Sequence, residues 1–86
     1  MDPWKILKYP HMTEKSVGMI ESENKIVFVV DRDSDKVSVK KAFESAFDVK
    51  VEKVNVEVTM KGEKKAYIKL KPENKAIDVA VKLGIV

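Results

Sequence analysis

The fold is decided by a stretch that reads Val54-Asn55-Val56-Glu57-Val58-Thr59-Met60-Lys61-Gly62-Glu63-Lys64-Lys65-Ala66-Tyr67-Ile68-Lys69-Leu70. Apolar residues alternate with polar ones on both sides of Gly62, and this period of two predicts two β-strands. Because only the short turn Lys61–Gly62–Glu63 separates them, the strands are expected to pair as a hairpin. The second strand should turn Ala66, Ile68 and Leu70 inward. The residues expected to point outward are Lys65, Tyr67, Lys69 and Lys71.

The alternation slips just before this hairpin. Val49 and Val51 have the opposite parity from Val54, so a β-bulge or a late strand start is expected near Glu52–Lys53. Further upstream, Ile26–Val30 is a continuous apolar run bounded by polar residues. Such a run predicts a strand that is buried on both faces, central in its sheet and covered by helices on both sides.

Three helices are expected around these strands. The first starts at Thr13, whose hydroxyl can cap it, and the second runs from about Lys36 to Phe47 after a cap at Ser34 or Asp35. The third ends at Gly84, the residue type favoured just after a helix. The apolar stripes are expected to be Val17 and Ile20, then Val39, Phe43, Ala46 and Phe47, and last Ile77, Ala80 and Val81.

The N-terminal segment Pro3–Tyr9 is either one helical turn or a short edge strand, and Tyr9–Pro10 should end it. Counted as a strand, it gives the order β-α-β-α-β-β-α. This order predicts an α+β fold, a small three-layer sandwich with helices on both faces of a mostly antiparallel sheet of about four strands. The 86 residues, 1–86, are expected to form a single domain.

Positive charge is concentrated in one part of the chain. Residues 60–75 carry six lysines and two glutamates, a net charge of +4, whereas the whole chain carries +3. The other seventy residues therefore sum to −1. A local cluster of cations around an outward aromatic, Tyr67, favours nucleic-acid binding over a merely soluble surface.

Nothing in the sequence supports an enzyme, a metal site or a cofactor. The chain has no cysteine, and its one histidine, His11, has no second histidine or cysteine to share a metal. Asp31–Asp35 resembles the start of a calcium loop, but Lys36 and Ala42 stand where an EF-hand requires Gly and Glu. No signal peptide or membrane-spanning run is visible, so a soluble, cytoplasmic protein is expected.

Three segments resemble a known family. Leu7–Lys15 contains Pro10, Thr13, Glu14 and Lys15 in the Pro-x-x-Thr/Ser-Glu-Lys pattern of the L-twenty-three family, universal proteins of the large ribosomal subunit. Phe47–Asn55 is similar to the helix-to-strand segment of that family, and Lys64–Lys71, with Val79 downstream, is similar to its signature. The resemblance covers nearly the whole chain in the right order.

The resemblance implies a structural protein that binds large-subunit rRNA beside the polypeptide exit tunnel of the ribosome, next to the L-twenty-nine family protein. It also implies docking of the signal recognition particle and the translocon, without membrane insertion. The acidic docking residues of the family match Glu14 and Asp48. Together, the resemblance and the charge cluster predict RNA contacts at Lys8, Tyr9, Pro10, His11, Thr13, Lys15, Lys61, Lys64, Lys65, Tyr67 and Lys69.

One departure from the family pattern concerns the hairpin. Bacterial members carry a long basic extension there, whereas Lys61–Gly62–Glu63 is a short turn, so the chain resembles an archaeal-type member. A tunnel-lining role and the bacterial ribosome-bound chaperone are then not expected. The alternative function is a protein-protein interaction module that acts by sheet-edge pairing, because a small α+β domain can present an open strand.

Overall fold

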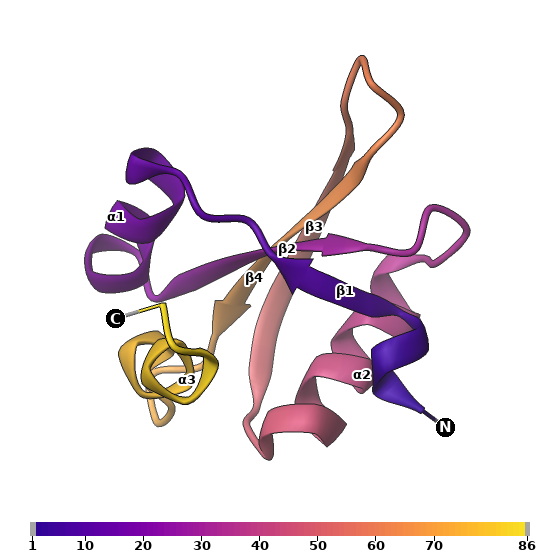
Figure 1. The fold of residues 1–86 in the computed structure, drawn as a ribbon. Helices are drawn as coiled ribbons and strands as arrows, with labels where there is room; N and C mark the ends of the chain where they lie inside the picture. Colours follow the sequence, from indigo (N-terminus) through magenta and orange to yellow (C-terminus); the bar gives the residue numbers. More distant parts are fainter. Residues whose placement is uncertain (1, 86) are drawn as a thin grey trace.

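The computed structural model describes residues 2–85. Within this range, helices and strands follow one another in the predicted order, and a turn of 3-10 helix precedes them (Figure 1). The elements are η1 (Pro3–Lys5), β1 (Leu7–Pro10), α1 (Glu14–Ser22), β2 (Lys25–Val30), α2 (Lys36–Phe47), β3 (Val51–Val58), β4 (Lys64–Leu70) and α3 (Ala76–Leu83). Both alternatives for the N-terminal segment therefore occur, one after the other. None of the described helices combines the length and the apolar character needed to cross a membrane.

The four strands form one antiparallel sheet in the order β1-β2-β4-β3. The expected hairpin pairs β3 with β4, and the expected bulge is present, because the register shifts between Val51 and Lys53. A second shift between Leu7 and Tyr9 sets Lys8 aside in the edge strand β1. β2 lies inside the sheet between β1 and β4, as its apolar run predicts.

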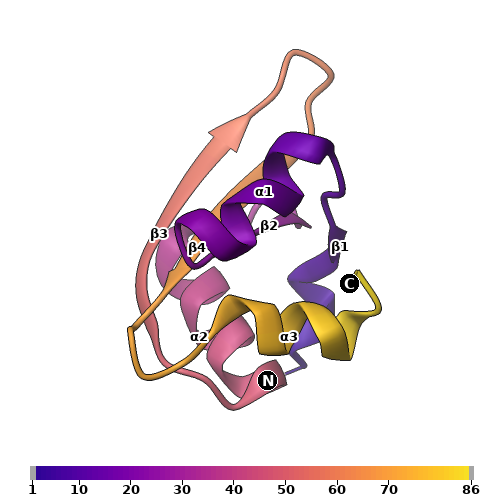
Figure 2. The ribbon, with the colours of Figure 1, turned by 90° about the vertical axis from the view of Figure 1, so that its left-hand side faces the viewer.

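Helices cover both faces of the sheet, which confirms the three-layer α+β prediction. Figure 1 shows α2 and α1 on opposite sides of the strongly twisted sheet, and Figure 2 shows α1 and α3 side by side at one end of it. Ile26, Phe28 and Val30 join the core under α2 and α3. Val27 and Val29 point to the other face and are equally buried, so β2 is covered on both sides as expected.

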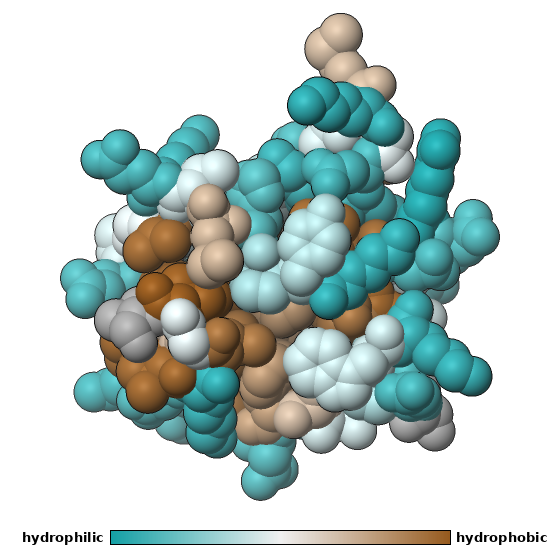
Figure 3. Space-filling model, viewed as in Figure 1, coloured by the Kyte–Doolittle hydropathy of each residue, from teal (hydrophilic) through white to brown (hydrophobic). Residues whose placement is uncertain are grey.

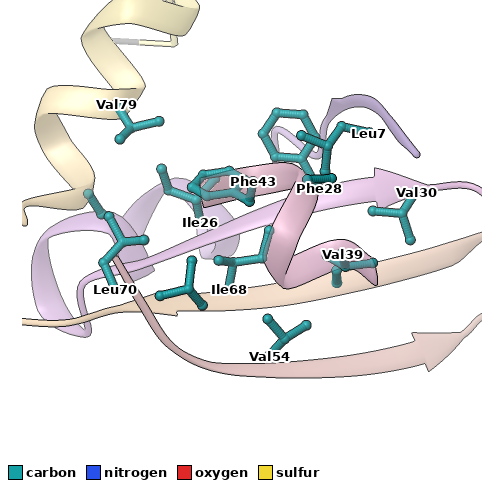
Figure 4. Packing of buried hydrophobic residues seen from close by; sticks show 14 of the residues in the cluster. Leu7, Ile26, Phe28, Val30, Val39, Phe43, Val54, Ile68, Leu70 and Val79 are labelled. Atoms are coloured by element: carbon teal, nitrogen blue, oxygen red, sulfur yellow. The ribbon is translucent and has the colours of Figure 1, made fainter. Parts of the chain in front are cut away.

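The core lies between the sheet and the helices α2 and α3 (Figure 4), and Ile20 of α1 also belongs to it. Phe28 and Phe43 are fully buried and meet edge to face, with ring centroids 5.7 Å apart. Burial of such a side chain stabilises the fold by about 1.5–3 kcal/mol. Trp4 extends this aromatic group outward, because it packs on Phe47 at 5.8 Å while half of its side chain stays exposed.

Two details of the predicted apolar pattern are wrong. In α3 the buried residues are Ala76, Val79 and Ala80, whereas Val81 is 57% exposed. The helix begins at Ala76, and its buried side follows the spacing i, i+3 and i+4 from there, which turns Val81 to solvent. In the first strand of the hairpin, the apolar positions of the alternating pattern are not buried near the turn. Val58 and Met60 extend beyond the helices and are exposed.

Asn24 holds three segments together at the end of α1. Its backbone is left-handed, with a φ of 56°, and its side-chain amide donates hydrogen bonds to the carbonyls of Leu70 and Asn74. Its Oδ1 accepts a bond of 2.7 Å from the Ala76 N–H. Lys75, the N-cap residue of α3, makes no side-chain cap bond, so Asn24 supplies the cap from a distant part of the chain.

Candidate nucleic-acid interface

A groove of about 240 Å³ lies on the sheet face that α1 partly covers. We call it the sheet-face groove, and its lining residues are His11, Thr13, Lys15, Ser16, Met19, Val27, Lys65 and Tyr67. It brings together residues of the Leu7–Lys15 motif and the outward face of β4, which lie more than forty residues apart in the sequence. The pairing of Val27 with Tyr67 explains this, because β2 stands between the two segments.

The Thr13 end of the groove is held by a capping box at the start of α1. The Thr13 hydroxyl accepts a hydrogen bond from the Ser16 N–H, and the Ser16 Oγ accepts one of 2.8 Å from the Thr13 N–H. The Ser16 hydroxyl also donates to the His11 carbonyl at 2.7 Å, and the His11 N–H donates to Val27. These bonds fix His11 and Thr13 against the sheet, so groups that face a ligand are preorganised.

Sequence analysis did not single out Ser16, which is buried at 4% exposure. A signal for it was present, because a Ser or Thr cap followed three residues later by a polar side chain marks a capping box. Here the third residue is Ser16 in place of the more usual Glu or Gln.

The groove has an excess of positive charge. Within residues 2–85, the ion pairs are Lys25 with Glu23 and Lys69 with Glu52, the latter at 3.9 Å. Lys15 and Lys65 therefore have no carboxylate oxygen within 4.0 Å in the described part of the chain. Unpaired cations beside a partly buried aromatic ring suit phosphates and bases. Among the described residues, no group of His, Asp and Glu is arranged to hold a metal ion.

Lys64 is separated from the other predicted lysines of β4. It shares the inward parity of Ala66 and Ile68, and its ammonium donates to the carbonyl of Ser34 in the β2–α2 loop. The outward positions are Lys65, Tyr67 and Lys69, whose side chains are half-buried. The structure therefore gives Lys64 a structural contact, whereas the other three residues share the open face.

The remaining predicted RNA contacts lie toward the hairpin turn. Lys8 and Lys61 are exposed near that turn, and the Tyr9 hydroxyl donates a 2.8 Å hydrogen bond to the Glu63 carboxylate. This hydrogen bond, with the nearby negative charge, raises the pKa of Tyr9 above its ordinary value of 10.0. Pro10 ends β1 and leads directly into His11, so β1 links the residues near the hairpin turn to those of the groove along the backbone.

The two predicted protein-docking carboxylates do not lie together. Glu14 is exposed in the first turn of α1, while Asp48 follows α2 on the other side of the sheet. Asp48 borders a hollow of about 560 Å³ near the end of α2. The residues that line this acidic hollow are Glu44, Asp48, Val49, Lys50, Glu73 and Asn74. Neither the acidic hollow nor an ion pair of residues 2–85 includes both Glu14 and Asp48.

Comparison with known proteins places the chain in a family. Residues 5–79, most of the chain, match the family described as Ribosomal protein L23. The chain belongs to that family. The large ribosomal subunit protein uL23 of Methanothermobacter thermautotrophicus is 53% identical over 85 residues, which is 99% of each chain. The protein of the same name from Methanococcus aeolicus is 48% identical over 85 residues, again 99% of each chain.

Membership in the ribosomal protein L23 family confirms several predictions from the sequence. It confirms the resemblance and its archaeal character, since both relatives come from archaea. It also confirms the prediction of a structural protein of the large ribosomal subunit, and not an enzyme. Such a protein is localised to the ribosome and associated with ribosomal RNA.

Proposed function

We propose that residues 1–86 act as one rRNA-binding domain, which grips large-subunit rRNA near the polypeptide exit tunnel through the sheet-face groove. The observation that carries the proposal is the meeting of two predicted motifs in one groove with unpaired lysines at both sides. Lys15 and Lys65 neutralise phosphates, and Tyr67 offers a ring to a base or a ribose. The fixed backbone of His11 and Thr13 sets the register on the folded RNA.

Salt dependence of binding tests the groove. The double variant Lys15→Gln with Lys65→Gln removes two cations that have no internal partner. Because each phosphate contact contributes about 0.7–0.9 to the slope of log K against log salt, the slope should become less steep by about 1.4–1.8. Binding to a cognate large-subunit rRNA fragment is measured by titration at several salt concentrations.

A matched control comes from α2. Lys40→Gln with Lys41→Gln makes the same charge change at two exposed residues that line none of the hollows described here. This variant should keep the wild-type slope. If both double variants change the slope equally, the net charge and not the groove governs binding, and the proposed interface is wrong.

Position near the exit tunnel is supported by family membership together with the short hairpin connection. Five residues, Thr59–Glu63, join β3 to β4, so the chain has no long extension at this turn. We infer that the domain sits at the tunnel exit without lining the tunnel. Crosslinking in the assembled large subunit, read out at rRNA positions and neighbouring proteins, tests this placement; crosslinks confined to regions remote from the exit would contradict it.

Protein docking is proposed for surfaces that do not suit RNA. The acidic hollow beside Asp48 repels phosphates and fits basic segments of nascent-chain factors such as the signal recognition particle or the translocon. Figure 3 shows apolar side chains gathered where α1 and α3 meet, and Val81 of α3 is 57% exposed. This apolar surface suits a neighbouring protein such as the L-twenty-nine family member.

The docking proposal is tested separately from RNA binding. Asp48→Lys should weaken capture of the signal recognition particle by reassembled subunits while leaving rRNA affinity intact. The same two measurements on Glu14→Lys test the second acidic position. If neither variant weakens capture of the signal recognition particle, neither Asp48 nor Glu14 belongs to the docking surface.

Sheet-edge pairing, the alternative function, is disfavoured by both edge strands. β1 carries an irregular register at Lys8 and ends in Pro10, which cannot donate a backbone hydrogen bond. β3 carries a bulge near Glu52 and exposed charges at Lys53 and Glu57. Bulges, prolines and charges are devices that prevent edge pairing, so added strands are not expected.

A further inference from the structure

A further hollow of about 260 Å³ lies where the hairpin turn, the β2–α2 loop and β1 meet. We call it the hairpin pocket, and its lining residues are Lys8, Tyr9, Val29, Val30, Arg32, Lys61, Gly62, Glu63 and Lys64. Four of these side chains are cationic and one is a carboxylate. Figure 3 shows hydrophilic side chains gathered around the hairpin and the neighbouring loop. The pocket is separate from the sheet-face groove, and the two share no lining residue.

The cations of the hairpin pocket lack internal partners of opposite charge. No carboxylate oxygen of residues 2–85 lies within 4.0 Å of the charged groups of Lys8, Arg32 or Lys61. Asp31 and Asp33 flank Arg32 in the sequence, yet neither forms an ion pair with it. Three unpaired cations around one concavity leave a net positive field that an anion can satisfy.

The single carboxylate of the pocket is occupied. Glu63 accepts the 2.8 Å hydrogen bond from the Tyr9 hydroxyl and forms no ion pair with the surrounding cations. Tyr9 thus holds Glu63 against β1, which keeps this negative charge from neutralising Arg32 or Lys61.

Gly62 makes room for the Arg32 side chain. A Cβ atom added to Gly62 would lie 3.3 Å from Nη1 of Arg32, tighter than ordinary van der Waals contact. Gly62 also has a φ of 86°, which side chains rarely adopt. The turn therefore lets the Arg32 guanidinium come close to the backbone of the hairpin at the rim of the pocket.

We propose that Arg32, together with Lys8 and Lys61, forms a second RNA contact in which the guanidinium binds one backbone phosphate. Arginine suits this task because its fixed fork of N–H donors matches two phosphate oxygens at once. The inference rests on the proposed function, since the phosphate belongs to the same RNA that the sheet-face groove holds. It adds Arg32, a residue in neither of the two predicted motifs, and gives Tyr9 and Glu63 distinct tasks.

The test compares Arg32 variants on the cognate rRNA fragment. Arg32→Gln should weaken binding about tenfold, the loss of one charge-assisted contact, and reduce the salt slope by about 0.7–0.9. Arg32→Lys should restore the salt slope but not the full affinity, because a point charge lacks the two-pronged geometry. Lys40→Gln, on the exposed side of α2, is the matched control and should change neither quantity.

Two further variants test the task assigned to Glu63. Glu63→Gln should tighten binding a few-fold by removing the only negative charge of the pocket. Tyr9→Phe keeps the ring but frees the Glu63 carboxylate to pair with a neighbouring cation, so it should weaken binding, and the double variant Tyr9→Phe with Glu63→Gln should recover it.

The outcomes separate this pocket from the groove. If the wild-type protein does not bind the rRNA fragment, the proposed function fails and the pocket with it. A second outcome is that the wild type binds and the Lys15 and Lys65 variant binds more weakly, but Arg32→Gln behaves as Lys40→Gln does. In that case the groove stands and the phosphate pocket is overturned. Tighter binding by Arg32→Gln would overturn it as well.

Discussion

Replacement of Asn24 is the sharpest test of how the fold is held together. Its side chain makes three hydrogen bonds, to the Leu70 carbonyl at 3.2 Å, to the Asn74 carbonyl at 2.9 Å and from the Ala76 N–H at 2.7 Å. Each contributes about 1 kcal/mol net, so Asn24→Gly should lower the free energy of unfolding by about 2–4 kcal/mol. Gly keeps the left-handed backbone without strain, so this variant isolates the hydrogen bonds.

Asn24→Ala adds a second, separable cost. An alanine at a φ of 56° should lose about a further 1–2 kcal/mol, because its Cβ crowds the backbone in the left-handed region. The expected order of stability is wild type, then the Gly variant, then the Ala variant. A domain of this size is stable by only about 4–13 kcal/mol, so the Ala variant should lose a large part of its stability.

Urea denaturation followed by circular dichroism measures these differences. A loss of 2–4 kcal/mol corresponds to a fall in Tm of about 8–30 °C for a domain of this size. Asn55→Ala, at an exposed position of β3, is the control and should stay within about 0.5 kcal/mol of wild type. An Ala variant at least as stable as the Gly variant would refute the strain argument, and a Gly variant indistinguishable from wild type would refute the hydrogen-bond argument.

Three other predictions concern single residues. Ser16→Ala should lower the free energy of unfolding by about 1–3 kcal/mol in urea titrations, because it leaves the Thr13 N–H and the His11 carbonyl without their partner; an unchanged midpoint would contradict this. The Ser38 backbone N–H holds the pKa of Asp35 below its usual 3.8, so this cap stabilises the fold above that pH and its contribution is lost as the pH falls through the lower, folded-state pKa. The Tm gap between wild type and Asp35→Ala should therefore close in acid, whereas a gap that widens there would reverse the sign. In a Tyr67→Phe background, phenolate absorbance should show Tyr9 titrating above pH 10.0, and Glu63→Gln should bring it back toward that value; no change would mean that the hydrogen bond is absent in solution.

The strands could be predicted from the sequence because their patterns are local. Alternation around Gly62 marked the hairpin, the change of parity marked the bulge near Glu52, and the run Ile26–Val30 marked a central strand. The same pattern, applied one residue further, would have placed Lys64 on the inward side with Ala66. The prediction grouped Lys64 with its neighbours by charge, and the structure adds a contact of its ammonium with the Ser34 carbonyl.

The parts that sequence analysis missed depend on distant contacts. Val81 is exposed because the position of α3 over the sheet, and not its own hydrophobicity, decides which side is buried. Ser16 and Asn24 work through hydrogen bonds to segments whose closeness only the folded chain reveals. Arg32 belongs to a loop with no cationic pattern of its own, and it meets the hairpin turn only because β2 and β4 are neighbours.

The strand order has a consequence for how the protein joins a growing particle. The groove needs residues 11–19 and residues 65–67 at the same time. Residues 65–67 belong to β4, which comes near the end of the chain and lies beside β2 only when the two strands pair. A partly synthesised chain thus carries Lys15 without Lys65 beside it, and no fragment that stops before β4 presents a complete surface. Non-local strand pairing is slow compared with helix formation. On the proposed function, a chain that lacks β4 should therefore bind rRNA more weakly than the folded domain, which would discourage premature capture during assembly.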